Sequence, residues 1–277
     1  MSVVAMLQGA PQTDILTTRS ALALARRLNA PLTGLCALPD PQSALMVVSA
    51  PEAAGLSGAA VASILELQKQ ALANSEAAFR DVVTTGAHGL DCTFVRQVGS
   101  AQQAAASAAT LSEALVFPRS AARNAEPLSI AFDTVMMEVR LPLVLSGQDA
   151  FEAGPVIIAW DGSNAASRAV RFHAHLIRAG TEVIIAQNRK DAERDGARPG
   201  MTPGSLEDWL RRKGVNARSV ALEGEVAAAL LNLAAQAGAT LIVAGAYGHS
   251  RLGERLFGGT SRRLLEANQA PALALAR

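Results

Sequence analysis

Two distant stretches of this chain share one local pattern, and that repeat constrains the fold more than any other feature. Val3–Ala10 and Val156–Ser163 are each a short apolar run that ends in a polar residue and then a glycine. A helical segment follows each stretch, and a second short apolar run follows each helix. Internal repeats of this kind indicate that one structural unit is used more than once. The chain is therefore expected to contain two similar units.

The two units also end alike, which helps to place the boundary between them. Leu141–Leu145 and Ala270–Leu275 each put a short apolar strand directly behind a proline, and a strand accepts proline at its first residue. Gly147–Pro155 is the best linker in the chain. Because 277 residues can bury two ordinary cores, we predict two domains, residues 1–147 and 154–277.

Apolar runs alternate with helical patterns along both predicted domains. This alternation is typical of βαβ units and a parallel sheet, so the predicted fold is α/β with two tandem doubly wound domains. In the first domain, the Pro-, Ser- and Ala-rich stretch Asp40–Gly58 precedes a long helix over about 60–85. That stretch is too long for a plain connector, so it could be a lid, a partner contact or a mobile loop, and we favour a mobile loop. In the second domain the predicted helices begin after Ser163, at a capping box starting with Ser205, at Glu225, and near Thr260.

Charge and composition exclude several classes of protein. Lys and Arg number 25 and Asp and Glu 24, so no basic excess indicates nucleic acid binding. No apolar run is long enough to span a membrane, and the first residues lack the basic region of a signal peptide. The chain has two cysteines, too few for a disulfide scaffold. We therefore expect a cytoplasmic protein with no nucleic acid or membrane partner.

A glycine-rich segment, Gly245–Ser261, is the best candidate for a binding site. Gly245 and Gly248 follow the end of an apolar strand, where ligands bind in open α/β sheets. Gly258, Gly259, Thr260 and Ser261 then open a helix, whose free N–H groups favour phosphate. An isolated glycine would be interpreted as a turn residue. Here the spacing favours a phosphate-binding loop.

The segment reads Gly, two residues, Gly, nine residues, Gly, and then a hydroxyl-rich stretch. This spacing resembles the nucleotide-binding signature of the universal stress protein family. The resemblance covers the second half of the chain, including the Asp161–Ser163 turn, and in weaker form the first half. It implies that each domain has a five-stranded, mostly parallel sheet with helices on both faces, a fold similar to that of the adenine nucleotide α-hydrolases. It also implies pairing of the domains through their last strands, and ATP, with Mg²⁺, as the ligand.

The resemblance further implies the contacts of that nucleotide. Adenine and ribose would lie against the end of the domain's first strand, at Ala159, Trp160 and Asp161, and near Ala186 at the end of its second strand. The Asp161 carboxylate can accept hydrogen bonds from a ribose, and it can also form an Asx turn; both roles can hold together. The phosphates would lie on Gly245, Tyr247, Gly248, Gly258, Gly259, Thr260 and Ser261.

Three departures from the family pattern bear on this interpretation. Gly259 stands where ATP-binding members have a hydroxyl residue, and one lost neutral hydrogen bond costs about 0.5–1.5 kcal/mol. Trp160 is bulkier than usual and either stacks on adenine, fills its space or belongs to the core. In the first half, the region 116–127 has no glycine and Gln8 takes the Asp position. We therefore interpret the first domain as degenerate. Arg119 and Arg123 could still meet an anion, but we favour an interpretation as solvated surface charges.

No catalytic or metal site is predicted. The chain contains neither a Gly-x-Ser-x-Gly elbow nor a P-loop, and His173 and His175, two apart on a helix, cannot share one metal ion. The leading hypothesis is a non-catalytic, ATP-binding stress-response protein with one site per chain; slow ATP hydrolysis is not predicted. The alternatives are a nucleotide-free scaffold of the same fold and, third, an enzyme that acts on adenine nucleotides. An internal pair could satisfy both last strands and leave a monomer, but exposed last-strand edges favour a homodimer.

Overall fold

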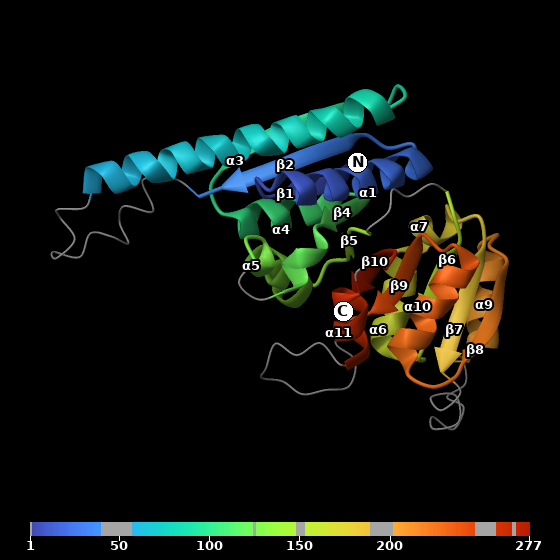
Figure 1. The fold of residues 1–277 in the computed structure, drawn as a ribbon. Coiled ribbons are helices and arrows are strands. Elements are labelled where there is room, and N and C mark those ends of the chain that lie inside the picture. Colours follow the sequence, from blue (N-terminus) through green and yellow to red (C-terminus); the bar gives the residue numbers. More distant parts are fainter. Residues whose placement is uncertain are drawn as a thin grey trace.

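The chain folds around one continuous ten-stranded sheet with the strand order β3-β2-β1-β4-β5-β10-β9-β6-β7-β8 (Figure 1). The second half of this order mirrors the first, so each half contributes five strands with the same connectivity. The five strands of the first half lie within residues 1–147 and those of the second within 154–277. The computed structural model describes residues 2–39, 57–123, 126–147, 153–188, 202–246, 259–267 and 270–277.

The first half alternates strands and helices, as its apolar pattern predicts. β1 is buried along its whole length, whereas β3, at the outer edge of the sheet, is largely exposed. Most of the predicted loop at residues 40–58 lies outside the described residues. The elements are β1 (Val3–Leu7), α1 (Pro11–Leu28), β2 (Leu32–Leu38), α3 (Ser57–Gly86), β3 (Cys92–Val98), α4 (Ala101–Leu111), β4 (Ala114–Phe117), η2 (Arg119–Ala122), α5 (Ser129–Asp133), η3 (Thr134–Val139) and β5 (Leu143–Leu145).

The second half repeats this plan, with shorter helices after its first two strands. Its first two strands are buried because helices cover both faces of the sheet there. The elements are β6 (Val156–Ala159), α6 (Asn164–Phe172), α7 (Ala174–Arg178), β7 (Val183–Asn188), α9 (Pro203–Arg212), β8 (Ala217–Leu222), α10 (Val226–Ala237), β9 (Leu241–Gly245), α11 (Gly259–Glu266) and β10 (Ala272–Ala276).

Helix starts in the second half follow local capping chemistry. The Ser163 side chain accepts a hydrogen bond from the amide of Ala166 at 3.1 Å, so α6 begins where predicted. Helix α10 begins at Val226, one residue after the predicted start, and Glu225 is its cap. The predicted cap at Ser205 is wrong. Thr202 caps α9 instead, by accepting from the Ser205 amide at 3.2 Å, because proline at the first helical position favours a start there.

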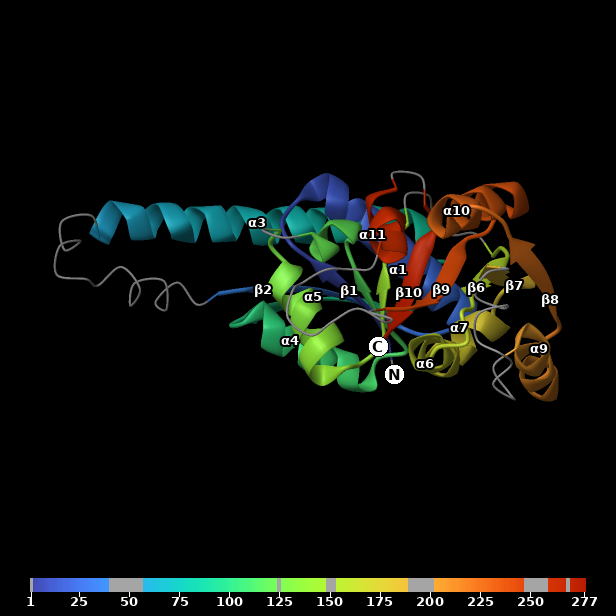
Figure 2. The same cartoon turned by 90° about the horizontal axis from the view of Figure 1, so that it is seen from below.

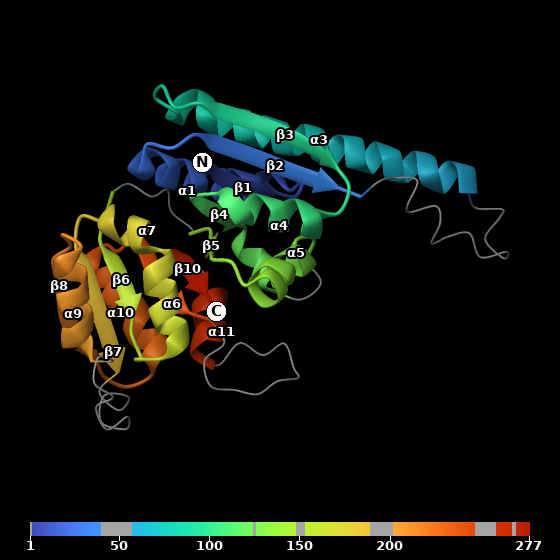
Figure 3. The same cartoon turned by 180° about the vertical axis from the view of Figure 1, so that it is seen from behind.

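The two halves join through their last strands. β5 and β10 pair antiparallel, with Val144 opposite Ala274, and every other pair of strands in the sheet is parallel. This confirms two five-stranded, mostly parallel half-sheets. Both last strands are paired inside the chain, so the free edges from which a homodimer is predicted do not exist. The outer strands are β3 and β8, at opposite ends of the molecule (Figure 3).

Helices cover both faces of the sheet in each half (Figure 2). Successive strand residues point to opposite faces, so Val3 and Ala5 belong to one core and Val4 and Met6 to the other. We call these the first core, covered by α1, α3, α6, α7 and α9, and the second core, covered by α4, α5, η3, α10 and α11. Each core contains residues of both halves. Within the described ranges, no helix is long and apolar enough to cross a membrane.

Candidate functional site

The candidate site lies where the chain order of the strands reverses. From β6 the chain runs outward to β7 and β8, and it then returns to β9 on the other side of β6. Ligands of open α/β sheets bind at such a switch point, outside the carboxyl ends of the strands. The register pairs Ala159 with both Ala186 and Ala244. The ends of three neighbouring strands therefore bring Ala159, Ala186 and Gly245 together.

Asp161 leaves the end of β6 in a turn that leads into α6. Its Oδ1 accepts a hydrogen bond from the Ser163 amide at 2.9 Å, so the Asx turn considered from the sequence is present. The residue is exposed. Among the described residues, Oδ2 accepts no hydrogen bond. The Asx turn therefore uses Oδ1 of Asp161 and leaves Oδ2 for another partner.

Gly245 has a packing role that the sequence does not reveal. A Cβ atom at this position would lie 2.5 Å from the amide nitrogen of Ala166 and 2.6 Å from the carbonyl carbon of Ala165. The first turn of α6 thus packs directly on the end of β9. Only glycine allows this approach, because no flexible side chain tip can give way here. The close packing also brings the turn after Asp161 next to the end of β9.

The remaining signature residues follow the end of β9. Tyr247, Gly248 and Gly258 lie outside the described residues. Gly259 is the first residue of α11, and Thr260 and Ser261 lie in its first turn. α11 packs against α10 and places Leu264 and Leu265 in the second core. The helix start that the hydroxyl-rich stretch predicts is therefore present, with one residue of difference.

The Trp160 indole lies on the other face of the sheet from the two alanines. Trp160 is 6% exposed and packs in the first core, whereas Ala159 and Ala186 belong to the second core side. The amide of Trp160 donates to the carbonyl of Ala186 at 2.8 Å. An adenine against Ala159 and Ala186 would therefore meet the backbone of Trp160, and its indole would lie behind the strand. The core interpretation of this residue fits its position.

In the first half, side chains of the neighbouring helices α1 and α3 occupy the corresponding loop after β1. The amides of Gln8 and Gly9 each donate to the Asp14 carboxylate at 3.0 Å, and the Ser75 hydroxyl donates to it at 2.6 Å. Gly9 has φ 87°, and a Cβ there would lie 2.5 Å from that of Ala71. Burial raises the pKa of Asp14, although the Ser75 and amide hydrogen bonds oppose this shift. Helix α3 thus packs across this strand end.

Asp14 and Ser75 were missed from the sequence. They lie 61 residues apart, so no local pattern connects them. The acidic residue in the first turn of the helix behind Gly9 was the only signal. Beside them, a hollow of about 580 Å³ remains at the ends of β1 and β2. Its lining is chiefly apolar, with Leu7, Leu38 and Leu128 among it.

Arg119 is not a solvated surface charge, and the prediction that it is was wrong. Its side chain is buried and donates to the carbonyls of Ser146 at 3.2 Å and Leu264 at 2.6 Å, and also to that of Pro271. Burial, and to a lesser degree Arg123, lowers the pKa of Arg119 to about 10. The antiparallel pairing of β5 with β10 brings these second-half carbonyls onto η2.

His173 and His175 have structural roles. His173 interrupts the predicted helix between α6 and α7, and its buried Nε2 lies 3.0 Å from the Leu275 carbonyl, so it carries the proton. Burial, and less strongly His175, lowers the pKa of His173 to about 4. His175 Nε2 bonds to the Glu113 carbonyl of the first half at 2.7 Å. In the described part of the chain, no group of three ionisable side chains could hold a metal ion.

Comparison with known proteins agrees with this fold. The model of the universal stress protein family matches residues 153–275. Residues 153–275 therefore form a domain of the universal stress protein family. None of the curated proteins matches the chain.

Solved structures of the same fold extend over the whole chain. A universal stress protein from Archaeoglobus fulgidus is similar over 100% of this chain and 99% of its own, with a TM-score of 0.60 and 13% identity. A protein of the universal stress protein family from Burkholderia pseudomallei is 24% identical, covers 44% of this chain and 94% of its own, and has a TM-score of 0.34. The first of these similarities supports a tandem arrangement of the fold.

Proposed function

We propose that this chain is a cytoplasmic, non-catalytic stress-response protein that binds one ATP, with Mg²⁺, in its second half. One observation carries the proposal. The ends of β6, β7 and β9 meet at the switch point of the second half-sheet, and Gly245 there begins the segment that leads to the N-terminus of α11. Backbone N–H groups at strand ends and helix starts favour phosphate.

Each part of the nucleotide has proposed partners. Ala159 and Ala186 face the adenine together with the backbone of Trp160, and the second oxygen of Asp161 accepts from the ribose. Thr260, Ser261 and the amides of Gly245 and Gly259 hold the phosphates, with Tyr247, Gly248 and Gly258 assigned by the family resemblance. A bound Mg²⁺ neutralises phosphate charge. The site thus consists of groups that bind and orient.

The proposal of a single site rests on the first half. There the loop amides of Gln8 and Gly9 are already bound to Asp14, and α3 lies against Gly9. Those donors are unavailable to a phosphate, because both N–H groups already donate to Asp14 and that of Gly9 also donates to Ser75. The first half acts instead as the internal partner of the second.

Isothermal titration with MgATP tests this proposal. We expect one ATP per chain, loss of binding in Gly248→Glu, and unchanged binding in Gln102→Glu, which adds the same charge at the hollow of the first half. Absence of binding to the unmodified protein, or equal binding in Gly248→Glu, contradicts an ATP site. Two ATP per chain contradicts the assignment of the first half as closed.

A nucleotide-free scaffold is the second candidate, and Gly259 favours it because the family's hydroxyl contact is missing there. Mass spectrometry of small molecules released from the purified protein distinguishes the two. Co-purified ATP or AMP contradicts the scaffold. A protein that carries no nucleotide and binds none in titration supports it.

We also propose a homodimer, now through the outer strands. Strand β3 ends the sheet and exposes Val95 and Val98, which are 37% and 72% accessible. Exposed apolar edge strands favour pairing with another chain. Light scattering after size exclusion measures the mass directly. A Val98→Lys variant should be monomeric, and a monomer without any substitution overturns this proposal.

A further inference from the structure

A second cavity lies on the first-core face of the second half. Helix α6 packs on β9 and β10, whereas α9 packs on β7 and β8. Between the two helices, a cavity of about 520 Å³ opens. Pockets of about 300–1,000 Å³ are typical of small-molecule sites. This cavity therefore has the size of a ligand site.

The floor of the cavity is apolar and aromatic. Trp160, Val170 and Leu206 line it and are 6%, 2% and 5% exposed, and Trp209 of α9 lines it from a half-buried position. The chain has two tryptophans, and both of them line this cavity. Indole faces offer a large, rigid surface on which a flat ring can stack. The floor thus favours a planar aromatic ligand.

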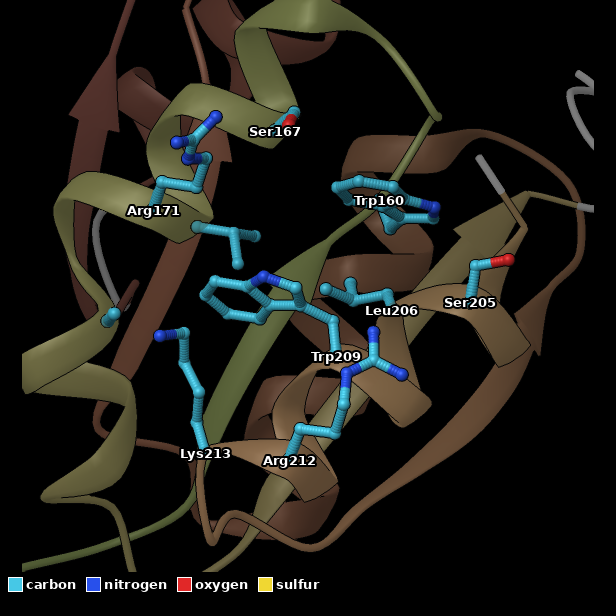
Figure 4. A pocket seen from close by; sticks show the side chains of 10 residues that line it. Trp160, Ser167, Arg171, Ser205, Leu206, Trp209, Arg212 and Lys213 are labelled. Atoms are coloured by element: carbon cyan, nitrogen blue, oxygen red, sulfur yellow. The ribbon is translucent and has the colours of Figure 1, made fainter. Parts of the chain in front are cut away.

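The rim of the cavity is positively charged. Arg171 comes from the last turn of α6, and Arg212 and Lys213 come from the end of α9 (Figure 4). The Lys213 ammonium lies 5.0 Å from the centroid of the Trp209 ring. Among the residues that the structure describes, no carboxylate lines the cavity or pairs with these three side chains.

A role at the helix ends does not account for this arrangement. Cations in the last turn stabilise each helix by itself. Arg211 serves α9 in that way, and it pairs with Asp208 at 2.5 Å outside the cavity. Arg171, Arg212 and Lys213 come from two helices and surround the Trp209 indole, with the guanidinium groups of Arg171 and Arg212 on opposite sides of it (Figure 4). Their convergence raises the local potential and favours an anion.

We propose that this cavity binds a planar aromatic carboxylate. The ring stacks on the indole of Trp209 above Leu206 and Val170, and the guanidinium group of Arg212 holds the carboxylate, while Arg171 and Lys213 add positive potential. A guanidinium suits this group because its planar fork matches two oxygens. Ser167 and Ser205, which also line the cavity, can donate hydrogen bonds to the ligand.

This site is separate from the proposed nucleotide site. Of the residues assigned to the nucleotide, only Trp160 lines the cavity. Its indole lies on the first-core side, while Ala159 and Ala186 face the second core. The two ligands would therefore bind on opposite faces of the sheet. The aromatic carboxylate site does not depend on whether ATP binds.

Tryptophan fluorescence gives a direct measurement, because both indoles lie in the cavity. The probe is 1-naphthoate, and 1-naphthylmethanol is its uncharged control. We expect saturable quenching by 1-naphthoate that weakens with added salt, and much weaker quenching by the alcohol. Equal affinity for the two compounds overturns the proposal.

Matched variants locate the binding. Arg212→Gln should weaken 1-naphthoate binding about tenfold, because it removes a charge-assisted hydrogen bond, and Arg171→Gln should weaken it less, because it removes only nearby positive charge. Arg211→Gln, one position away and outside the cavity, should bind as the unmodified protein does. Circular dichroism confirms that all variants are folded. If Arg211→Gln and Arg212→Gln bind equally, or if MgATP displaces 1-naphthoate, the proposed site is wrong.

Discussion

The guanidinium of Arg119 donates a 2.6 Å hydrogen bond to the carbonyl of Leu264, and so joins the first half of the chain to the last turn of α11. The carbonyls in the last turn of a helix lack partners within the helix, and a cation there also meets the negative end of its dipole. The same side chain holds the carbonyls of Ser146 and Pro271. One buried residue therefore connects η2, α11, the end of β5 and the start of β10.

Replacement of Arg119 should destabilise the whole protein. Arg119→Met keeps the apolar stem but leaves several buried carbonyls without donors, so we expect a loss of about 2–3 kcal/mol in the free energy of unfolding. Urea unfolding followed by circular dichroism measures it. Arg123→Met is the control, because Arg123 is exposed, and its unfolding midpoint should not change. Equal midpoints for the two variants contradict the role of Arg119.

Arg119 also marks the limit of what the sequence predicts. The strands, the cap at Ser163 and, within one residue, the start of α10 depend on neighbours within a few residues, and the sequence predicts them. The contact of Arg119 with Leu264 spans 145 residues, and no periodicity encodes it. The start of α9 is an intermediate case. Pro203 signals a start at Thr202, whereas the prediction used only the capping-box pattern at Ser205.

The candidate site, too, could be predicted from the sequence only in part. Strand ends follow from apolar runs, so the meeting of Ala159, Ala186 and Gly245 could be predicted. The face on which the Trp160 indole lies depends on strand register and on the helices packed above it. Likewise, the closure of the first-half loop by Asp14 requires α3 to cross it. Both facts arise from tertiary packing, which no local pattern specifies.

Gly245→Ala should lower stability even in the absence of any ligand. The added methyl group would meet the backbone of Ala165 and Ala166, which cannot rotate away, and overpacking of this kind costs about 1–3 kcal/mol. Thermal or urea unfolding of the ligand-free protein measures the change. Gly204→Ala is the control, since a Cβ there has only the Thr202 hydroxyl at 3.9 Å and lies in helix α9. If Gly245→Ala is as stable as Gly204→Ala, close packing is not the reason for this glycine.

His173 should make the protein sensitive to acid. Its native pKa of about 4 lies below the value of about 6.5 expected when unfolded, so between these values the unfolded chain takes up a proton that the native protein does not. The neutral imidazole's contribution is therefore complete above about pH 6.5 and is lost as the pH falls toward 4. The loss amounts to about 3 kcal/mol at most.

A comparison with His173→Gln isolates this effect. Glutamine can still donate to the Leu275 carbonyl but does not titrate. Asp14, whose pKa is raised, changes stability in the opposite direction, but it does so equally in both proteins. The difference in unfolding free energy between them should shrink or reverse as the pH falls from 6.5 to 4. A difference that stays constant with pH refutes the buried neutral histidine.

Asp161 allows its structural and binding roles to be separated. Asp161→Asn keeps an oxygen that can accept from the Ser163 amide, so the turn into α6 and the stability should be preserved. The variant lacks the negative charge, and a charge-assisted bond to the ribose would be replaced by a neutral one. ATP affinity should therefore fall severalfold. Asp161→Ala removes both acceptors and should lose stability as well as affinity. Titration calorimetry and urea unfolding of the two variants measure these effects side by side. If Asp161→Asn binds ATP as tightly as the unmodified protein, the carboxylate serves the turn alone.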